Sequence, residues 1–334
     1  MIARVRQFLV PFVPLYHMAL GFRELRLRRG WEPIRRLRFP VISIGNLSTG
    51  GAGKTPFAIA LAEALGGRGF AVDVLSRGYG RQSGGAARVR VNGSAEEFGD
   101  EPLLIARRAG VPVYVERERY DGGLLAEVDA EAGRSRVHIL DDGFQHRQLH
   151  RDIDILLLNR DDWRDRLLPA GNLREPLHAA RRATVLSIPA EDVGLGDELR
   201  AWGWRGPVWR LRRRMVVPEV EGTVVAFCGI ARPEQFFAGL EAAGMRLAER
   251  VAFRDHHRYT VRDLEWLQRA GRDRGARALV TTEKDQVRLM SLAGSGSGEA
   301  PVLAAGLRVE IEEHDEVLSW LTDRLRGTEL RPTL

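Results

Sequence analysis

The chain has 334 residues, of which 44% are apolar and 29% charged, so it is long enough to form one large or two smaller hydrophobic cores. Cys228 is its only cysteine, which excludes a disulfide framework and indicates a reducing, cytoplasmic setting. The net charge of +6 is local: nine arginines and two glutamates give residues 1–40 a charge of +7, so the rest of the chain sums to −1. A nucleic-acid partner is therefore not expected.

The first predicted element, in residues 1–38, is both basic and apolar. Its apolar centre, residues 8–22, is interrupted by Pro11 and Pro14 and is shorter than the ~20 apolar residues that span a bilayer. Arginines flanking Trp, Phe, Leu and Tyr are typical of an amphipathic helix at a membrane surface, where guanidinium groups meet anionic lipid phosphates. The alternative is a helix packed on its own domain with an exposed arginine face.

From residue 39 onward, β-branched apolar runs alternate with helical patterns, which predicts βαβ units around a parallel sheet. Residues 203–221 are basic, β-prone and punctuated by Gly and Pro, and a second alternation follows them. We therefore predict an α/β fold with two α/β/α P-loop-type domains and mainly parallel sheets. The predicted boundaries are an N-terminal membrane-surface segment at 1–38, a P-loop kinase domain at 39–205, an extended β linker at 206–221, and a second α/β domain at 222–334.

The stretch "GNLSTGGAGKTP", residues 45–56, follows a predicted strand and opens a predicted helix. Backbone N–H groups of such a Gly-rich turn bind phosphates, while a lysine reaches the β/γ oxygens and a threonine binds Mg²⁺. A serine stands where the strict pattern has its first glycine, but the variant "TGGAGKT" form fits. The alternative is a Gly-rich turn of purely structural use. The predicted ATP-binding residues are Ser48, Thr49, Gly50, Gly51, Ala52, Gly53, Lys54 and Thr55.

Asp141 and Asp142 end a predicted buried strand, at the sheet edge where α/β proteins bind ligands. Adjacent carboxylates repel each other unless a cation offsets them, so the pair predicts a Mg²⁺ site. The alternative is an Asp-Asp-Gly turn. His146 and His150 have the i, i+4 spacing of zinc ligands, but the sequence offers no clear third ligand.

Four further stretches carry candidate residues. Asp100 and Glu101 precede a predicted helix and by themselves indicate a helix N-cap. "FRDHHRYT" places Asp255, His256 and His257 in a turn, where acid and imidazole suit proton removal from a hydroxyl or simply a loop hydrogen bond. "SRGYGR" and "PAGNLREP" are Gly-containing loops with arginines suited to phosphate, although each alone is typical of a solvated turn.

The chain contains 51 basic residues, yet only Lys54 and Lys284 are lysines. A lysine retained against such a bias can mark a site that needs a compact ammonium group. Lys54 lies in the phosphate loop, and no role for Lys284 follows from the sequence.

Seven ordered motifs, "GNLSTGGAGKTP", "SRGYG", "FGDEP", "DDGFQH", "GNLREP", "FRDHHRYT" and "TTEKD", span nearly the whole chain. In this combination the sequence resembles the tetraacyldisaccharide 4'-kinases of lipid A biosynthesis. The resemblance implies Mg²⁺-dependent transfer of the ATP γ-phosphate to the 4'-hydroxyl of an acylated disaccharide 1-phosphate. It also implies a peripheral protein on the cytoplasmic face of a bacterial inner membrane, with a lipid A precursor and the anionic membrane surface as partners.

The resemblance implies roles residue by residue. Catalysis falls to Lys54 and to Asp100 acting with a histidine of "DHH", for which His257 is preferred over His256. Metal binding falls to Thr55, Asp141, Asp142 and Glu101, and substrate binding to Arg77, Tyr79, Arg147 and Arg174. Two other classes remain as alternatives: a P-loop ligase or synthase with a soluble carboxylate substrate, and a P-loop ATPase switch or partitioning-type protein without lipid kinase activity.

Overall fold

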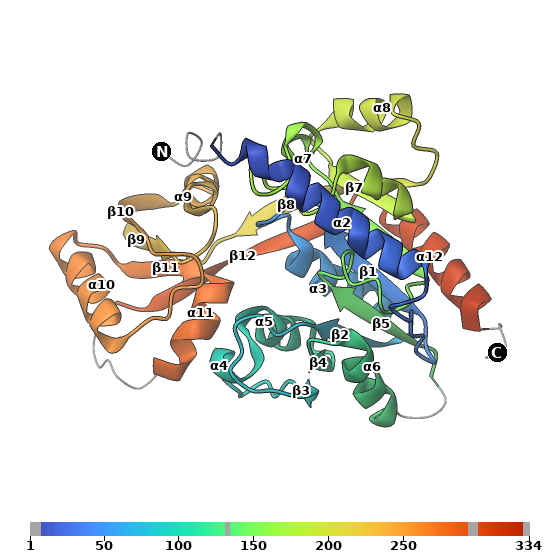
Figure 1. The fold of residues 1–334 in the computed structure, drawn as a ribbon. Helices are drawn as coiled ribbons and strands as arrows, with labels where there is room; N and C mark the ends of the chain where they lie inside the picture. The colour runs from blue at the N-terminus through green and yellow to red at the C-terminus, as the bar shows by residue number, and fades with distance from the viewer. Residues whose placement is uncertain (1–7, 131–133, 293–299, 330–334) are drawn as a thin grey trace.

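The structure, a computed structural model, describes residues 8–130, 134–292 and 300–329. Through them runs one mixed, mostly parallel sheet with the strand order β10-β9-β11-β12-β8-β7-β6-β1-β5-β2-β4-β3 (Figure 1). Only the pairs β3 with β4 and β8 with β12 are antiparallel among the described strands. The strands are β1 Val41–Asn46, β2 Ala71–Ser76, β3 Ala87–Arg88, β4 Val113–Val115, β5 Arg136–Asp141, β6 Ile153–Leu157, β7 Val185–Pro189, β8 Val208–Val216, β9 Thr223–Cys228, β10 Arg246–Ala252, β11 Ala278–Thr282 and β12 Val302–Ile311.

Helices cover the sheet, as parallel strands joined by crossover connections require. The α-helices are α2 Val13–Arg28, α3 Lys54–Gly67, α4 Ala95–Phe98, α5 Asp100–Ala109, α6 Arg119–Val128, α7 Arg160–Arg164, α8 Val193–Ala201, α9 Pro233–Ala242, α10 Val261–Asp273, α11 Glu283–Leu289 and α12 His314–Glu329. Short 3₁₀ helices are η1 Val10–Phe12, η2 Leu177–Arg182 and η3 Met290–Leu292.

Two lobes can be distinguished along the sheet. The N-terminal lobe contains β1 to β7, and the C-terminal lobe, residues 223–292, contains β9, β10, β11 and helices α9 to α11 (Figure 1). The predicted linker forms strand β8, which pairs with β7 on one side and with β12 on the other. The sheet is therefore continuous between the lobes, and a division into two domains at residues 206–221 stays a prediction.

The end of the chain packs against the N-terminal lobe, whereas the predicted boundaries place all of residues 222–334 in the second α/β domain. Leu321 and Leu325 of α12 are buried in the same apolar cluster as Ile44 of β1 and Phe57 of α3. The physical reason is the antiparallel pairing of β12 with β8, which carries the chain back out of the C-terminal lobe.

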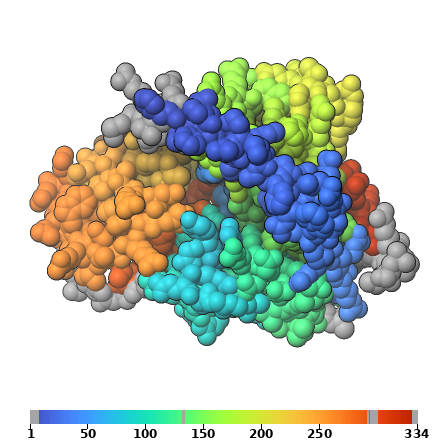
Figure 2. Space-filling view, viewed as in Figure 1, coloured from blue at the N-terminus to red at the C-terminus, as the bar shows by residue number. Residues whose placement is uncertain are grey.

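Helix α2 lies on the surface of the N-terminal lobe (Figures 1 and 2). Its inner face is held by polar contacts, among them a hydrogen bond of 2.9 Å from the Tyr16 hydroxyl to the Arg174 carbonyl oxygen. Its outer face is apolar: Leu15, Met18 and Phe22 are each about 60–70% exposed at helical spacing. None of the helices in the described residues combines the length and the apolar character that spanning a bilayer requires.

A buried ionic cluster lies inside the N-terminal lobe. The His138 ring is fully buried, with Nδ1 3.4 Å from Asp73 Oδ2 and Nε2 3.7 Å from Glu127 Oε1. Burial by itself lowers the pKa of His138, but the two carboxylates outweigh that effect and raise it above its ordinary value. The charged form of His138 therefore contributes to the stability of this lobe.

Candidate active site

The phosphate loop joins the carboxyl end of β1 to the start of α3. Gly50 and Gly53 have φ angles of 109° and 81°, in the left-handed region that glycine adopts without strain. Ser48, the residue that departs from the strict pattern, is buried, and its hydroxyl accepts a hydrogen bond of 3.1 Å from the Asn46 side chain. The loop thus has the backbone form of a phosphate cradle at a helix N-terminus, and the serine fixes its first part.

Lys54 is tied to the neighbouring strand end. Its ammonium group donates to Asn46 Oδ1 at 2.9 Å and lies 3.5 Å from Asp142 Oδ1. Arg174 binds the same carboxylate with both Nη atoms, at 3.0 and 2.8 Å, and also donates to Asn46 Oδ1 at 2.6 Å. Burial raises the pKa of Asp142, but Lys54 and Arg174 outweigh it and hold the pKa well below its ordinary value. Asp142 is therefore a permanent anion between two cations.

Asp141 has the opposite environment. It is buried at the end of β5, and its Oδ1 accepts no hydrogen bond from the described residues. Burial, then the negative charges of Glu101 and Asp142, raise the pKa of Asp141 to about 7. A buried carboxylate with an unsatisfied oxygen is stabilised by a bound cation.

This donor set fits Mg²⁺. The described residues contain no group of three His, Cys, Asp or Glu side chains that could hold a metal. Mg²⁺ does not need such a group, because it usually takes one or two carboxylates and completes its shell with water and substrate phosphates. Asp141 and Asp142, beside the phosphate loop that carries Thr55, provide that number.

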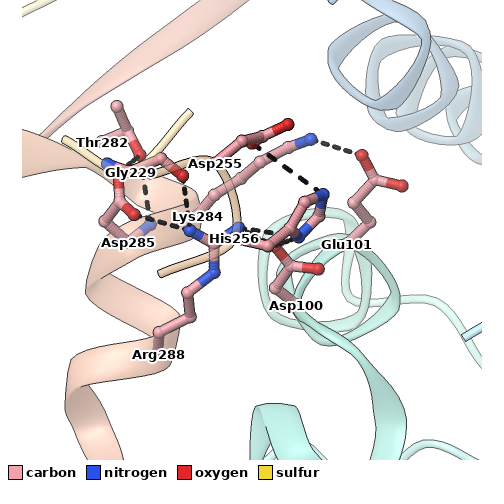
Figure 3. A network of polar contacts seen from close by, with 9 residues as sticks. All are labelled: Asp100, Glu101, Gly229, Asp255, His256, Thr282, Lys284, Asp285 and Arg288. Atoms are coloured by element: carbon pink, nitrogen blue, oxygen red, sulfur yellow. Dashed lines mark hydrogen bonds and ion pairs between the residues drawn. The ribbon is translucent and has the colours of Figure 1, made fainter. Parts of the chain in front are cut away.

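A second polar centre joins the two lobes (Figure 3). Asp100 is the first residue of α5, whose N-cap, Gly99, supplies no side-chain cap. Rather than capping the helix, the Asp100 carboxylate reaches the C-terminal lobe, where its Oδ2 lies 3.3 Å from His256 Nδ1 and accepts a hydrogen bond from Arg288. The other ring nitrogen of His256 is 4.0 Å from Asp255 Oδ1. Tertiary structure thus builds the acid and imidazole pair that the sequence only suggested.

The preference for His257 as the partner of Asp100 does not match this geometry. The His257 ring stacks on Phe253 with 4.6 Å between centroids, and its Nε2 lies 3.2 Å from Asp263 Oδ2. His256, by contrast, has a φ of 56°, a backbone conformation that is uncommon for a residue with a side chain. Because the two backbones differ, the neighbouring rings diverge, and His256 faces the other lobe.

Comparison with known proteins decides the family. The model of the tetraacyldisaccharide-1-P 4'-kinase family matches residues 5–326. The chain belongs to this family. Its relatives include the tetraacyldisaccharide 4'-kinases of Koribacter versatilis, 41% identical over 92% of this chain and 96% of the relative, and of Aquifex aeolicus, 38% identical over 94% and 97%. A solved structure described as "apo" form LpxK from Aquifex aeolicus in complex with ATP aligns with a TM-score of 0.76 and 36% identity, covering 96% of this chain and 99% of that one.

The four substrate-binding residues predicted from the family resemblance have different surroundings in the structure. Arg174 contacts Asp142, as described above, and the Tyr79 ring lies 5.4 Å from the His256 ring between centroids. Arg147 pairs with Glu24 of α2, and Arg77 is exposed. All but Arg77 therefore contact a described part of the site or α2.

Besides Arg288, two further arginines of the site were not predicted. Arg119 is buried near the acidic pair, and burial together with Arg77 lowers its pKa to about 10, against the effect of Asp142 and Asp141. Arg213 of β8 donates to the Ala52 carbonyl oxygen at 2.6 Å and covers Gly53, so it lies against the phosphate loop. In the sequence nothing separates Arg213 from its basic neighbours, since only the pairing of β8 decides which face it occupies.

A pocket of about 370 Å³ lies between α2 and η2. Its lining includes Arg23 and Glu24 of α2, Glu175, which follows Arg174 in the chain, and Arg182. The pocket is therefore lined by the residue that follows Arg174 in the chain and by residues of α2, the helix with the apolar outer face.

Proposed function

We propose that this protein transfers the γ-phosphate of ATP to the 4'-hydroxyl of a tetraacyldisaccharide 1-phosphate, the reaction that gives its family its name. One observation carries the proposal. Helix α3, which begins at the phosphate loop, and helix α5, which begins with Asp100, pack in one apolar cluster, and the negative charge of Glu101 at the start of α5 helps to raise the pKa of Asp141 beside the loop. The phosphate loop and the Asp100–His256 pair therefore share one electrostatic environment, as a donor and an acceptor subsite must.

The residues divide the work of phosphoryl transfer. The N–H groups of Thr49 and Ala52 donate to the Asn172 and Gly50 carbonyl oxygens. The other backbone N–H groups of residues 48–55 and the Lys54 ammonium would bind the phosphates and offset their charge. Thr55, Asp141 and Asp142 would hold Mg²⁺, with assistance from Glu101, and bound Mg²⁺ supplies charge neutralisation at the β- and γ-phosphates. Arg174 fixes the orientation of Asp142 with a two-point contact.

Asp100 and His256 would receive the acceptor hydroxyl. Burial raises the pKa of Asp100, but His256, Arg288 and Lys284 outweigh it and hold the pKa well below its ordinary value, so the carboxylate is ionised. Its contacts with Arg288 and His256 use Oδ2, and no contact from the described residues uses Oδ1. Oδ1 can therefore accept a hydrogen bond from the 4'-hydroxyl and orient it, which suits a reaction that depends mainly on positioning.

The experiment is direct transfer of labelled phosphate. Purified protein, [γ-³²P]ATP, Mg²⁺ and the disaccharide 1-phosphate in detergent should give a labelled lipid, whose label maps to the 4'-position. ATP hydrolysis without a labelled lipid would instead favour the ATPase-switch alternative.

We further propose that the outer face of α2 rests on an anionic membrane surface, which places the protein peripherally on the cytoplasmic face of a bacterial inner membrane. Support comes from the exposed apolar face of α2 beside Arg26 and Arg28, whose side chains are 45% and 76% exposed. A recess opens beneath α2 between the lobes (Figure 2).

Vesicle sedimentation tests the surface. Replacing both Met18 and Phe22 by Glu should reduce binding to vesicles that contain phosphatidylglycerol. The control replaces Leu124 and Val128 of α6 by Glu, which places the same two charges, also four residues apart, on apolar side chains that are 41% and 81% exposed. Equal binding by both variants would contradict the proposed surface.

A further inference from the structure

Lys284, the second lysine of the chain, lies on α11 of the C-terminal lobe together with Arg288. The two residues are four apart, so they share one face of the helix. That face meets two successive residues of the N-terminal lobe: Lys284 pairs with Glu101, and Arg288 pairs with Asp100 (Figure 3). The start of α5 and the face of α11 therefore form a matched double contact between the lobes.

Arg288 is held by contacts within the C-terminal lobe as well as by Asp100. Its Nη1 donates to Asp285 Oδ1 at 2.7 Å and to the Gly229 carbonyl oxygen at 2.9 Å. Asp285 is itself fully buried, and its Oδ2 accepts from the Thr282 hydroxyl at 2.7 Å. Because the side chain of Arg288 is only 9% exposed, its guanidinium has little freedom to reorient.

The other end of the same guanidinium holds both members of the acid and imidazole pair. Nη2 donates to Asp100 Oδ2 and lies 3.1 Å from His256 Nδ1. His256 comes from a loop and is 40% exposed, so packing alone does not fix its ring. Arg288 is thus the buried cation in contact with both residues.

Helix α11 is anchored in both lobes. Val287 is buried in the apolar cluster of the N-terminal lobe that contains Leu103 and Ile105 of α5, whereas Leu289 is buried in a cluster of the C-terminal lobe. The helix therefore transmits the position of one lobe to the other through close-packed side chains.

We propose that Arg288 is a positioning residue of the phosphoryl-transfer site: from the C-terminal lobe it holds Asp100 and His256 in the geometry that receives the acceptor hydroxyl. Lys284 supports this arrangement by holding Glu101, the residue next to Asp100. The role assigned to Arg288 rests on the proposed function, because Asp100 and His256 are its acceptor subsite.

The test compares three variants in lipid phosphorylation assays. Arg288→Ala should lower kcat about 10²-fold, because small displacements of catalytic groups cost that much, while the KM for ATP changes less than about threefold. Arg288→Lys should recover part of the loss, since an ammonium group restores the charge but cannot contact Asp285 and Asp100 with a planar fork. The control is Arg108→Ala, which removes another ion pair between α5 and α11, that with Glu283, and should leave kcat unchanged.

Two further measurements separate positioning from folding and from the proposed function. Thermal unfolding identifies any variant that fails to fold. If Arg288→Ala fails to fold, Arg288→Lys provides the test, and its kcat should lie below that of the wild type. The ring ¹⁵N resonances of His256, assigned with His256→Gln, should shift in Arg288→Ala but not in Arg108→Ala, whether or not the lipid is a substrate.

The outcomes are distinct. Any of four results would overturn the role of Arg288. These are His256 resonances that do not shift, equal kcat losses in Arg288→Ala and Arg108→Ala, full wild-type kcat in either Arg288 variant, and an effect confined to the KM for ATP. Absence of lipid phosphorylation by the wild-type protein would overturn the proposed function, and the resonance shifts would still test the positioning.

Discussion

Replacing His256 and His257 one at a time should show that the two adjacent histidines have different roles. We expect the first replacement to affect mainly kcat and the second to affect mainly stability. His256→Ala should lower kcat for lipid phosphorylation by about 10²-fold, the lower end for loss of a group that assists proton transfer. The lower end applies because Asp100 keeps its contact with Arg288 when the imidazole is removed. Stability should fall by no more than about 1 kcal/mol, the cost of one hydrogen bond, since the His256 side chain is 40% exposed and Asp100 stays paired with Arg288.

His257→Ala should show the reverse pattern. Loss of the stack on Phe253 costs about 1 kcal/mol, and loss of the contact with Asp263 costs about 1 kcal/mol more. Asp263 retains its capping contacts with Thr260, so α10 keeps its start. The sum of about 2 kcal/mol lowers Tm by a few degrees in a chain of this size, while kcat stays within about threefold of wild type.

The assays are initial rates of labelled-phosphate transfer for kcat and differential scanning calorimetry for Tm, with all three proteins prepared in parallel. A kcat loss in His257→Ala as large as that in His256→Ala, at full folding, would refute the assignment. So would normal kcat in His256→Ala, because the acceptor subsite would then not depend on the ring that faces Asp100.

Three other changes test the remaining parts of the site and fold. Lys54→Ala should lower lipid phosphorylation by at least about 10²-fold, because it removes a cation at the developing phosphate charge, with an unchanged circular dichroism spectrum. Arg213→Ala should raise the KM for ATP about tenfold through loss of a charged contact at the phosphate loop, whereas Arg214→Ala, exposed on the same strand, should not. Because the pKa of His138 is raised on folding, its contribution is complete below its ordinary pKa of about 6.5 and is lost as pH rises through the raised value. Urea unfolding should therefore show the stability gap between wild type and His138→Gln shrinking from pH 6 to pH 9.

Local motifs could be interpreted from the sequence because their chemistry depends on near neighbours. The phosphate loop needs a strand, glycines at positive φ and a lysine at the helix start, and residues 41–55 contain all of these in order. The acidic pair at the end of β5 was found for the same reason, since a buried apolar run predicts the strand that precedes it.

Contacts between distant segments could not be found in this way. Nothing near Arg213 in the sequence indicates that β8 turns this one arginine toward the phosphate loop. Two adjacent histidines look equivalent until the backbone at His256 is known. The sequence also did not decide which face of α2 is exposed, because packing decides the partner of each helix face. In the structure the apolar face is exposed.

The α/β class, the phosphate loop, the acidic pair and the family resemblance follow from the amino-acid sequence alone, since each depends on short stretches in a defined order along the chain. Three features depend on the folded chain: one sheet continues between the lobes, α12 packs in the core of the N-terminal lobe, and α11 brings Lys284 and Arg288 to Glu101 and Asp100. Strand pairing and side-chain packing join residues that are far apart in the chain, and local propensity carries no information about such partners.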